Sequence, residues 1–325
     1  MRVIQIHHPL TAAKVIDRPV VLAMGFFDGV HRGHQAVINR ARTIADERGL
    51  ALAVLTYDHH PALVYQKLTP ERNRYLTVNA RKMALFEQLG VDIVYQVNFA
   101  SQFAAQTPQE FVDHYLIGLH AAVVVAGYDH TYGPKDVATM DKLPKYAQNR
   151  FEIVVVGEKE LQSKKIGSSR IRHNLDQGDL KTVNDLLGYR YQTTGTVMHG
   201  EARGRTLGFP TANVSHDAQY WLPGIGVYVT RVKVNGKWYQ AMTSIGRNVT
   251  FGEGRPVTVE AYLLDFKQAI YGEIVTVEWD YRLRGEIKFD SVAGLIQQLN
   301  QDAQDTKAYF EAHPITKLAL EWINC

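Results

Sequence analysis

The chain has 325 residues, which is long for a single domain, so two domains are expected. Its formal net charge of +3 is small and does not by itself indicate a nucleic-acid-binding protein. The only cysteine is Cys325, which excludes an intrachain disulfide and predicts a reducing, cytoplasmic location. The N-terminus lacks the apolar core of a signal peptide, and no apolar run approaches the roughly 20 residues that span a bilayer. We therefore expect a soluble protein without nucleic-acid or membrane partners.

Short β-branched runs alternate with helical patterns in the first half of the chain. The runs typical of buried strands are VVLAMG (20–25), LALAVLTYD (50–58), VDIVYQV (91–97), AAVVVAG (121–127) and FEIVVVG (151–157). The amphipathic patterns between them cover residues 34–49, 79–90 and 108–119. Strands separated by such helices indicate a parallel, doubly wound sheet, which binds ligands at the carboxyl ends of its strands.

The pattern changes after a helical stretch over residues 168–188. Turns then separate runs with strand character at residues 191–200, 226–246, 256–266 and 273–284. Asn235-Gly236 lies between two alternating runs and predicts a hairpin. Antiparallel strands without intervening helices indicate a small barrel or sandwich, and a C-terminal helix is predicted over 291–310. We place the domain boundary near residue 187, which divides the chain into residues 1–186 and 187–325.

The segment GFFDGVHRGH, residues 25–34, joins the first of these strands to its helix. Its glycines let the backbone approach a ligand, and the start of a helix offers unpaired N–H groups to a phosphate. His31 and His34, three residues apart, would face the same anion and stabilise charge on a transferring phosphate. The spacing matches neither G-x-G-x-x-G nor the P-loop. Two alternatives remain: a zinc site that recruits the histidines at 59–60, and a turn with two incidental histidines.

Three segments match the motifs of one enzyme family in order along the chain. GFFDGVHRGH resembles the H-x-G-H signature of the nucleotidyltransferases in its bacterial flavin form, TYDHHP (56–61) resembles T-F-D-P-H-P, and IGSSRIR (166–172) resembles I-S-S-T-x-I-R. The chain thus resembles the bacterial bifunctional riboflavin kinase/FMN adenylyltransferases. The resemblance implies a Rossmann-like α/β nucleotidyltransferase domain in which His31, His34 and Arg172 act on the ATP phosphates. It assigns to the phosphate cradle Gly25, Asp28, Gly33, Ser168 and Ser169. A plain helix N-cap is the alternative for SSRIR.

A second signature, GEARGRTLGFPTANV, covers residues 200–214. Pro210 stiffens the approach to Thr211, and a threonine hydroxyl with an asparagine carbonyl two residues on suits Mg²⁺ held largely by phosphates. The segment resembles the P-T-A-N motif of riboflavin kinases, which implies a small antiparallel barrel in which Thr211 and Asn213 hold the metal. The resemblance assigns to ATP the residues Gly204, Arg205 and Gly208. A glycine- and proline-rich barrel turn with an exposed arginine is the alternative.

The segment PVTVEAYLLDF, residues 256–266, carries the candidate base of the kinase. Its alternation places Glu260 on the face opposite Val257 and Val259. The segment resembles the family's V-E-x-H-L-L-D-F, whose glutamate is the proposed base for the ribityl 5′-hydroxyl, so the resemblance implies that Glu260 is catalytic. A solvated surface glutamate is the alternative. Tyr262 stands where the family has histidine.

Several positions depart from the family's motifs. The loop Gly127–Asp136 departs most: it keeps Asp129, which the resemblance assigns to flavin binding, but replaces two phenylalanines of G-x-D-F-x-F-G. The replacements are His130 and Tyr132 in that loop, Phe26 for asparagine, His59 for proline, Gly167 for serine, and Asn248 and Val249 for an arginine and a proline. No catalytic role is therefore assigned to the segment around Asn248.

The resemblance implies a two-step synthesis of flavin cofactors. ATP with Mg²⁺ phosphorylates riboflavin to FMN, and FMN then attacks the α-phosphorus of ATP to give FAD and pyrophosphate. The expected small-molecule partners are riboflavin, FMN, FAD, ATP, ADP and pyrophosphate, with no tightly bound redox cofactor. Two alternatives are a monofunctional riboflavin kinase with an impaired adenylyltransferase domain, and a flavin-binding regulator. An oligomer is compatible with the sequence and not required by it.

Overall fold

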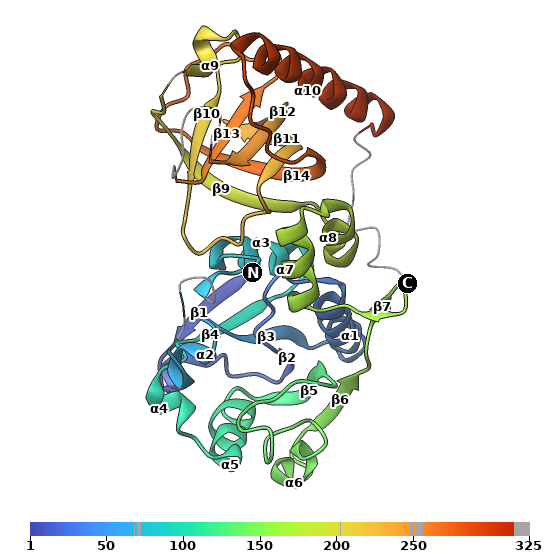
Figure 1. The fold of residues 1–325 in the computed structure, drawn as a ribbon. Coiled ribbons are helices and arrows are strands. Elements are labelled where there is room, and N and C mark those ends of the chain that lie inside the picture. The colour runs from blue at the N-terminus through green and yellow to red at the C-terminus, as the bar shows by residue number, and fades with distance from the viewer. Residues whose placement is uncertain (68, 70–72, 202, 248–249, 251–255, 315–325) are drawn as a thin grey trace. The chain divides into compact units, whose positions relative to one another are not determined.

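The computed structural model describes residues 1–67, 69, 73–201, 203–247, 250 and 256–314 (Figure 1). Asn248, Val249 and Cys325 lie outside these ranges. The chain divides into two compact units, Met1–Ser168 and Ser169–Cys325, each built on its own sheet. The boundary predicted near residue 187 lies at the end of α8 (Leu180–Leu187), directly before the second sheet begins.

The first unit contains a six-stranded sheet in which every neighbouring pair is parallel, with strand order β1-β4-β3-β2-β5-β6. Its strands are β1 (Arg2–Ile6), β2 (Val20–Met24), β3 (Ala51–Tyr57), β4 (Ile93–Val97), β5 (Ala121–Gly127) and β6 (Glu152–Val156). The five predicted strands are confirmed. The sixth, β1, was not predicted, because it is a short edge strand in which only Ile4 and Ile6 are buried.

Helices cover both faces of this sheet (Figure 1). They are α1 (Arg32–Arg48), α2 (Ala62–Tyr65), α3 (Asn79–Gln88), α4 (Ser101–Ala104), α5 (Pro108–Phe111) and α6 (Leu143–Ala147), with 3₁₀ turn η1 (Ala12–Lys14). The pattern over 108–119 predicts one helix, but after α5 the chain continues as a π-helix, η3 (Val112–Ile117). The predicted stop at Gly49 is confirmed, since Gly49 closes α1 with a left-handed backbone, φ +63°. A small hairpin, β7 (Glu160–Leu161) and β8 (Lys164–Lys165), follows β6.

The strand order reverses at β2, which pairs with β3 on one side and with β5 on the other. In an open parallel sheet, ligands bind in the crevice at the carboxyl ends of the two strands that flank this reversal. The loop after β2 begins at Gly25 and the loop after β5 begins at Tyr128. The topology therefore places the GFFDGVH motif and the least family-like loop of the chain on the same edge of the sheet.

The second unit is a closed barrel of six antiparallel strands in the order β10-β13-β12-β11-β14-β9. Its elements are α7 (Ser168–Gln177), α8, β9 (Tyr191–Met198), α9 (Arg203–Thr206), β10 (Ala212–His216), β11 (Gly226–Val234), β12 (Lys237–Gly246), β13 (Thr258–Leu263), β14 (Ile274–Arg284) and α10 (Val292–Ala312). The hairpin at Asn235-Gly236 is confirmed, with both residues at positive φ. The C-terminal helix is confirmed as α10, capped by the Ser291 hydroxyl. Within the described ranges, every helix is too short or too polar to span a bilayer.

Candidate active sites

The loop after β2 holds an unusual backbone conformation. Phe27 and Val30 have positive φ values of 56° and 36°, which residues with a Cβ rarely adopt. Gly25 precedes them, and a Cβ there would lie 2.9 Å from the Phe27 ring. Glycine is therefore needed at this position for the Phe27 ring to fold back under the loop.

Asp28 attaches this loop to the segment before α3. Its Oδ1 accepts from the backbone amides of Leu76 at 2.9 Å and Thr77 at 3.2 Å. The Thr77 hydroxyl in turn accepts from the amide of Gly29 at 3.0 Å. From the far end of the unit, the Ser168 hydroxyl donates to the Asp28 carbonyl at 2.9 Å. The structure thus brings Asp28 and Ser168 together. The hydrogen bonds of the Asp28 carboxylate hold the loop after β2 in place.

His31 and His34 lie together at the start of α1. His31 is the N-cap: its Nδ1 accepts from the His34 amide at 3.3 Å, and the two rings stack with centroids 3.6 Å apart. A Cβ on Gly33 would lie 3.2 Å from the His31 ring, so glycine allows the ring to lie over the helix start. The pKa of His34 is well below its usual value, first because of burial and then because of charge on His31, Lys82 and His130. His34 is therefore a neutral imidazole at pH 7.

The loop after β5 contains one partly buried histidine and one exposed carboxylate. Burial lowers the pKa of His130 to about 4, and no described residue hydrogen-bonds to its Nε2, which is buried. Tyr132 is buried and stacks on Phe111 with a centroid distance of 5.5 Å. Asp129, by contrast, is exposed and pairs with Lys165 at 2.5 Å. A ligand that reached the Asp129 carboxylate would have to displace or accommodate this ion pair.

Ser169 and Arg172 lie on α7 and belong to the second unit. The Arg172 guanidinium lies over the Trp221 ring at 5.4 Å, and the Trp221 indole N–H donates to Asp176, one turn further along α7, at 2.8 Å. The indole thus contacts two successive turns of α7. The role of Arg172 beside the histidines of the first unit stays a prediction.

The barrel brings together three of the predicted residues of the second signature. Strand β10 lies between β9 and β13, and Asn213 is the direct antiparallel partner of Glu260, so both side chains leave the same face. The Thr211 hydroxyl donates to Glu260 Oε2 at 3.2 Å, and the Thr258 hydroxyl donates to Oε1 at 3.2 Å. Two hydroxyls therefore orient the Glu260 carboxylate beside the Thr211 and Asn213 oxygens.

The glycines of this signature make room for those side chains. A Cβ on Gly200 would overlap the side-chain amide of Asn213, and a Cβ on Gly204 would overlap backbone and approach Thr211 Oγ1 to 3.3 Å. Gly208 has a left-handed backbone, φ +83°. The loop therefore wraps closely around Thr211 and Asn213 only because these positions lack side chains.

The Thr211 hydroxyl and the Asn213 side-chain amide offer hard oxygen ligands that fit Mg²⁺, beside the Glu260 carboxylate. Arg205 is exposed, and its guanidinium donates to the Tyr271 hydroxyl at 3.3 Å. Among the described residues, no cluster of three or more His, Cys, Asp or Glu could itself hold a metal ion. A metal at Thr211 would therefore depend on ligands from a nucleotide, as Mg²⁺ in phosphoryl-transfer sites does.

A pocket adjoins Glu260 between the barrel strands and α10. Its lining comes from the barrel strands, the segment after β14 and α10: Thr211, Gly226, Val227, Met242, Ser244, Ile245, Gly246, Thr250, Glu260, Tyr262, Arg284, Glu286, Ile287, Phe289, Leu295, Leu299 and Asp302. Arg284 donates to Asp302 through Nε at 3.0 Å and Nη2 at 2.7 Å, and this pair joins the barrel to α10. Arg284, Glu286 and Asp302 were not predicted from the sequence, because no local pattern marks a contact between a strand end and a later helix.

Comparison with known proteins accounts for both units. A family model described as FAD synthetase matches residues 13–170, and one described as riboflavin kinase matches residues 187–310. The bifunctional riboflavin kinase/FMN adenylyltransferase of Listeria monocytogenes is 47% identical over 95% of this chain and 98% of its own. The chain belongs to the bifunctional riboflavin kinase/FMN adenylyltransferase family. The Bacillus subtilis member of this family is 41% identical over 95% of this chain and 98% of its own.

The family's two parts coincide with the two sheets. Residues 13–170 include all strands of the parallel sheet except β1, and residues 187–310 include the whole barrel and most of α10. A crystal structure from Streptococcus pneumoniae, described as a macrolide-efflux protein, is 36% identical with a TM-score of 0.85 and covers 94% of this chain and 99% of its own. The expected order of domains, a nucleotidyltransferase-like α/β domain followed by a riboflavin kinase-like barrel, is thus confirmed.

Proposed function

We propose that this chain phosphorylates riboflavin to FMN in its barrel and adenylylates FMN to FAD in its parallel-sheet unit, with release of pyrophosphate. The observation that carries the proposal is the placement of Thr211 and Asn213 around the Glu260 carboxylate, together with the stacked His31 and His34 at the strand-order reversal. Membership in a family of bifunctional enzymes supports both activities. A cytoplasmic location belongs to the same proposal.

In the kinase step, Glu260 takes the proton of the ribityl 5′-hydroxyl as that oxygen attacks the γ-phosphorus of ATP, the bond to the β,γ-bridging oxygen breaks, and ADP leaves. The hydrogen bonds from Thr211 and Thr258 fix the carboxylate for this task. The flavin ring enters the adjoining pocket, which is lined largely by apolar side chains and carries Tyr262 close to Glu260. Thr211 and Asn213 would hold Mg²⁺, which when bound with ATP offsets phosphate charge. Gly204, Arg205 and Gly208 contact the phosphates of ATP.

In the adenylyl step, the phosphate of FMN attacks the α-phosphorus of ATP, and the protein contributes position and charge stabilisation. The amides at the start of α1 and the imidazoles of His31 and His34 bind the phosphates. Because His34 is neutral, it acts as a hydrogen-bonding group until a phosphate raises its pKa. Arg172 takes the leaving pyrophosphate, aided by Ser168 and Ser169, and Asp129 contacts the flavin.

One assay tests the proposal. The full chain is incubated with riboflavin, ATP and Mg²⁺, and the flavins are separated by chromatography. FMN followed by FAD is expected, and with FMN as the substrate FAD alone. FMN without FAD would leave a riboflavin kinase with an impaired second site, and no turnover would leave a flavin-binding protein. Omission of Mg²⁺ is expected to stop FMN formation.

A further inference from the structure

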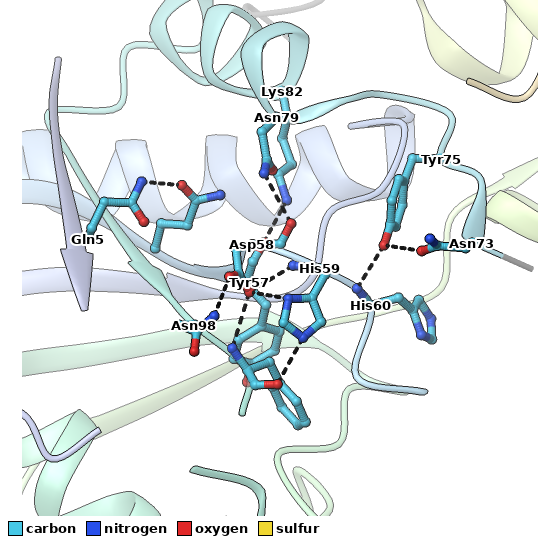
Figure 2. Close-up of polar contacts among 12 residues, drawn as sticks. Gln5, Tyr57, Asp58, His59, His60, Asn73, Tyr75, Asn79, Lys82 and Asn98 are labelled. Carbon is cyan, nitrogen blue, oxygen red and sulfur yellow. Dashed lines mark hydrogen bonds and ion pairs between the residues drawn. The ribbon is translucent and has the colours of Figure 1, made fainter. Parts of the chain in front are cut away.

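A lysine is buried behind the loop that carries the two histidines. Lys82 lies on α3 and is 2% exposed. Its Nζ donates to the carbonyl of Tyr57 at 3.0 Å and to the carbonyl of Phe26 at 3.4 Å, and lies 4.7 Å from the centroid of the Phe26 ring. Figure 2 shows Lys82 and Asn79 reaching from α3 toward the end of β3. All three partners of this ammonium are neutral groups.

These contacts join two neighbouring strands at their carboxyl ends. Tyr57 is the last residue of β3, and Phe26 stands in the loop after β2. Lys82 therefore connects the loop that leads to His31 with the loop that begins at Asp58. The ring of Phe26, which replaces the family's asparagine, is the surface on which the ammonium rests.

The loop at the end of β3 is held firmly on its other side. The Asp58 carboxylate accepts from the Asn98 amide at 2.7 Å and the Phe99 backbone at 3.1 Å, and lies 2.7 Å from His59 Nδ1 (Figure 2). The Asn79 side chain donates to the Asp58 carbonyl at 3.1 Å. Asp58, the first residue of this loop, is thus held by several side chains and by the Phe99 backbone, and Lys82 links the neighbouring Tyr57 carbonyl to the loop after β2.

Burial of this charge opposes folding rather than favouring it. Burial lowers the pKa of Lys82 to about 8, against the opposing effect of Asp28 and Asp58, so that the ammonium is mostly charged at pH 7. A methionine would fill the same space without an ammonium to desolvate. The charge also acts on His34, whose pKa it lowers. A costly charge placed beside a predicted phosphate site points to a role in that site.

We propose that Lys82 is a positioning residue for adenylyl transfer, which joins the loops after β2 and β3 and places a positive charge behind the cradle for the ATP triphosphate. The inference rests on the proposed adenylyltransferase activity. It goes beyond that activity by adding a residue that touches no substrate. The charge attracts the triphosphate through the loop, while the two carbonyl bonds set the distance between the histidines and the neighbouring strand end.

The test compares Lys82→Met and Lys82→Gln with a control, Lys159→Met, which changes an exposed lysine of the same unit. The full chain is assayed for FAD formation from FMN and ATP and, separately, for FMN formation from riboflavin. We expect kcat/KM for ATP in FAD formation to fall at least about ten-fold in both Lys82 variants, mainly through KM. FMN formation by the Lys82 variants is expected to stay at the wild-type level, and so are both activities of the Lys159→Met control. NMR titration of the His34 ring is expected to show a raised pKa, because a neighbouring cation is gone.

Three results would overturn the inference. One is that the wild type forms FAD and the Lys82 variants have the same kcat/KM for ATP as the wild type. Another is a fall in FMN formation equal to the fall in FAD formation. The third is that urea titration finds both Lys82 variants unfolded. Either of these two results would show that Lys82 has a structural role only. A wild type that forms no FAD at all would instead contradict the proposed function, and this inference with it.

Discussion

The Thr211 hydroxyl donates to Oε2 of Glu260 over 3.2 Å, from the loop before β10 to strand β13. The other carboxylate oxygen accepts from Thr258 at the same distance. A carboxylate held through both oxygens has one orientation, and a base must be aligned with one substrate hydroxyl to be effective. The two hydrogen bonds support the proposal that Glu260 is the base, for which a solvated strand glutamate is the alternative.

Glu260→Gln is expected to lower the rate of FMN formation by about 10²–10⁴-fold, because glutamine keeps the shape and one acceptor oxygen for a threonine hydroxyl but cannot accept the proton. FAD formation from FMN should be unchanged, since Glu260 lies in the barrel. The two rates are measured by chromatography of the flavins. A variant that kept more than about a tenth of the FMN rate would contradict the assignment.

His31→Ala and Asn213→Ala should separate the two activities. His31→Ala removes the ring that caps α1 and stacks on His34, and is expected to reduce FAD formation while FMN formation continues. Asn213→Ala removes an amide next to Gly200 and opposite Glu260, and is expected to do the reverse. The same chromatographic assay reports both. The two-site assignment fails if either variant, still folded, loses both activities.

Asp302→Asn should weaken riboflavin binding. The substitution breaks the two-pronged contact with Arg284, leaves the guanidinium beside the pocket without its carboxylate, and loosens α10 from the barrel. We expect the KM for riboflavin to rise and the free energy of unfolding to fall by about 3 kcal/mol. Asp305→Asn, an exposed position on the same helix, is the matched control. Equal KM values for the two variants would show that the Arg284 pair does not shape the pocket.

His130 should make the first unit sensitive to acid. Burial lowers its pKa to about 4, so between pH 6.5 and 4 the unfolded chain binds a proton that the folded chain does not, and stability falls as the pH falls through this range. The full shift corresponds to about 3 kcal/mol. His130→Phe, the family's residue, should remove this loss. Urea unfolding at pH 7.5 and 4.5 measures it, and an unchanged difference between the two pH values would refute the prediction.

The elements with strong local signals were predicted well. A glycine in the left-handed region closes α1, Asn235-Gly236 turns one hairpin, and the Ser291 hydroxyl caps α10. Each of these signals acts within a few residues, so it can be predicted from the sequence. The edge strand β1 and the short strand β10 were missed, because their few residues become strands only by pairing with β4, β9 and β13.

The sequence by itself determined the order of the motifs, the two classes of sheet and the residue types at both sites. Only the tertiary structure decided which groups face one another. Asp28 was predicted from its motif, but its bonds to the amides of Leu76 and Thr77 depend on a segment almost fifty residues away. Lys82 lies on the buried face of α3 with Leu85 and Phe86, and the sequence alone predicted neither its burial nor its partners. Contacts between distant segments arise when strands assemble, and no local pattern encodes them.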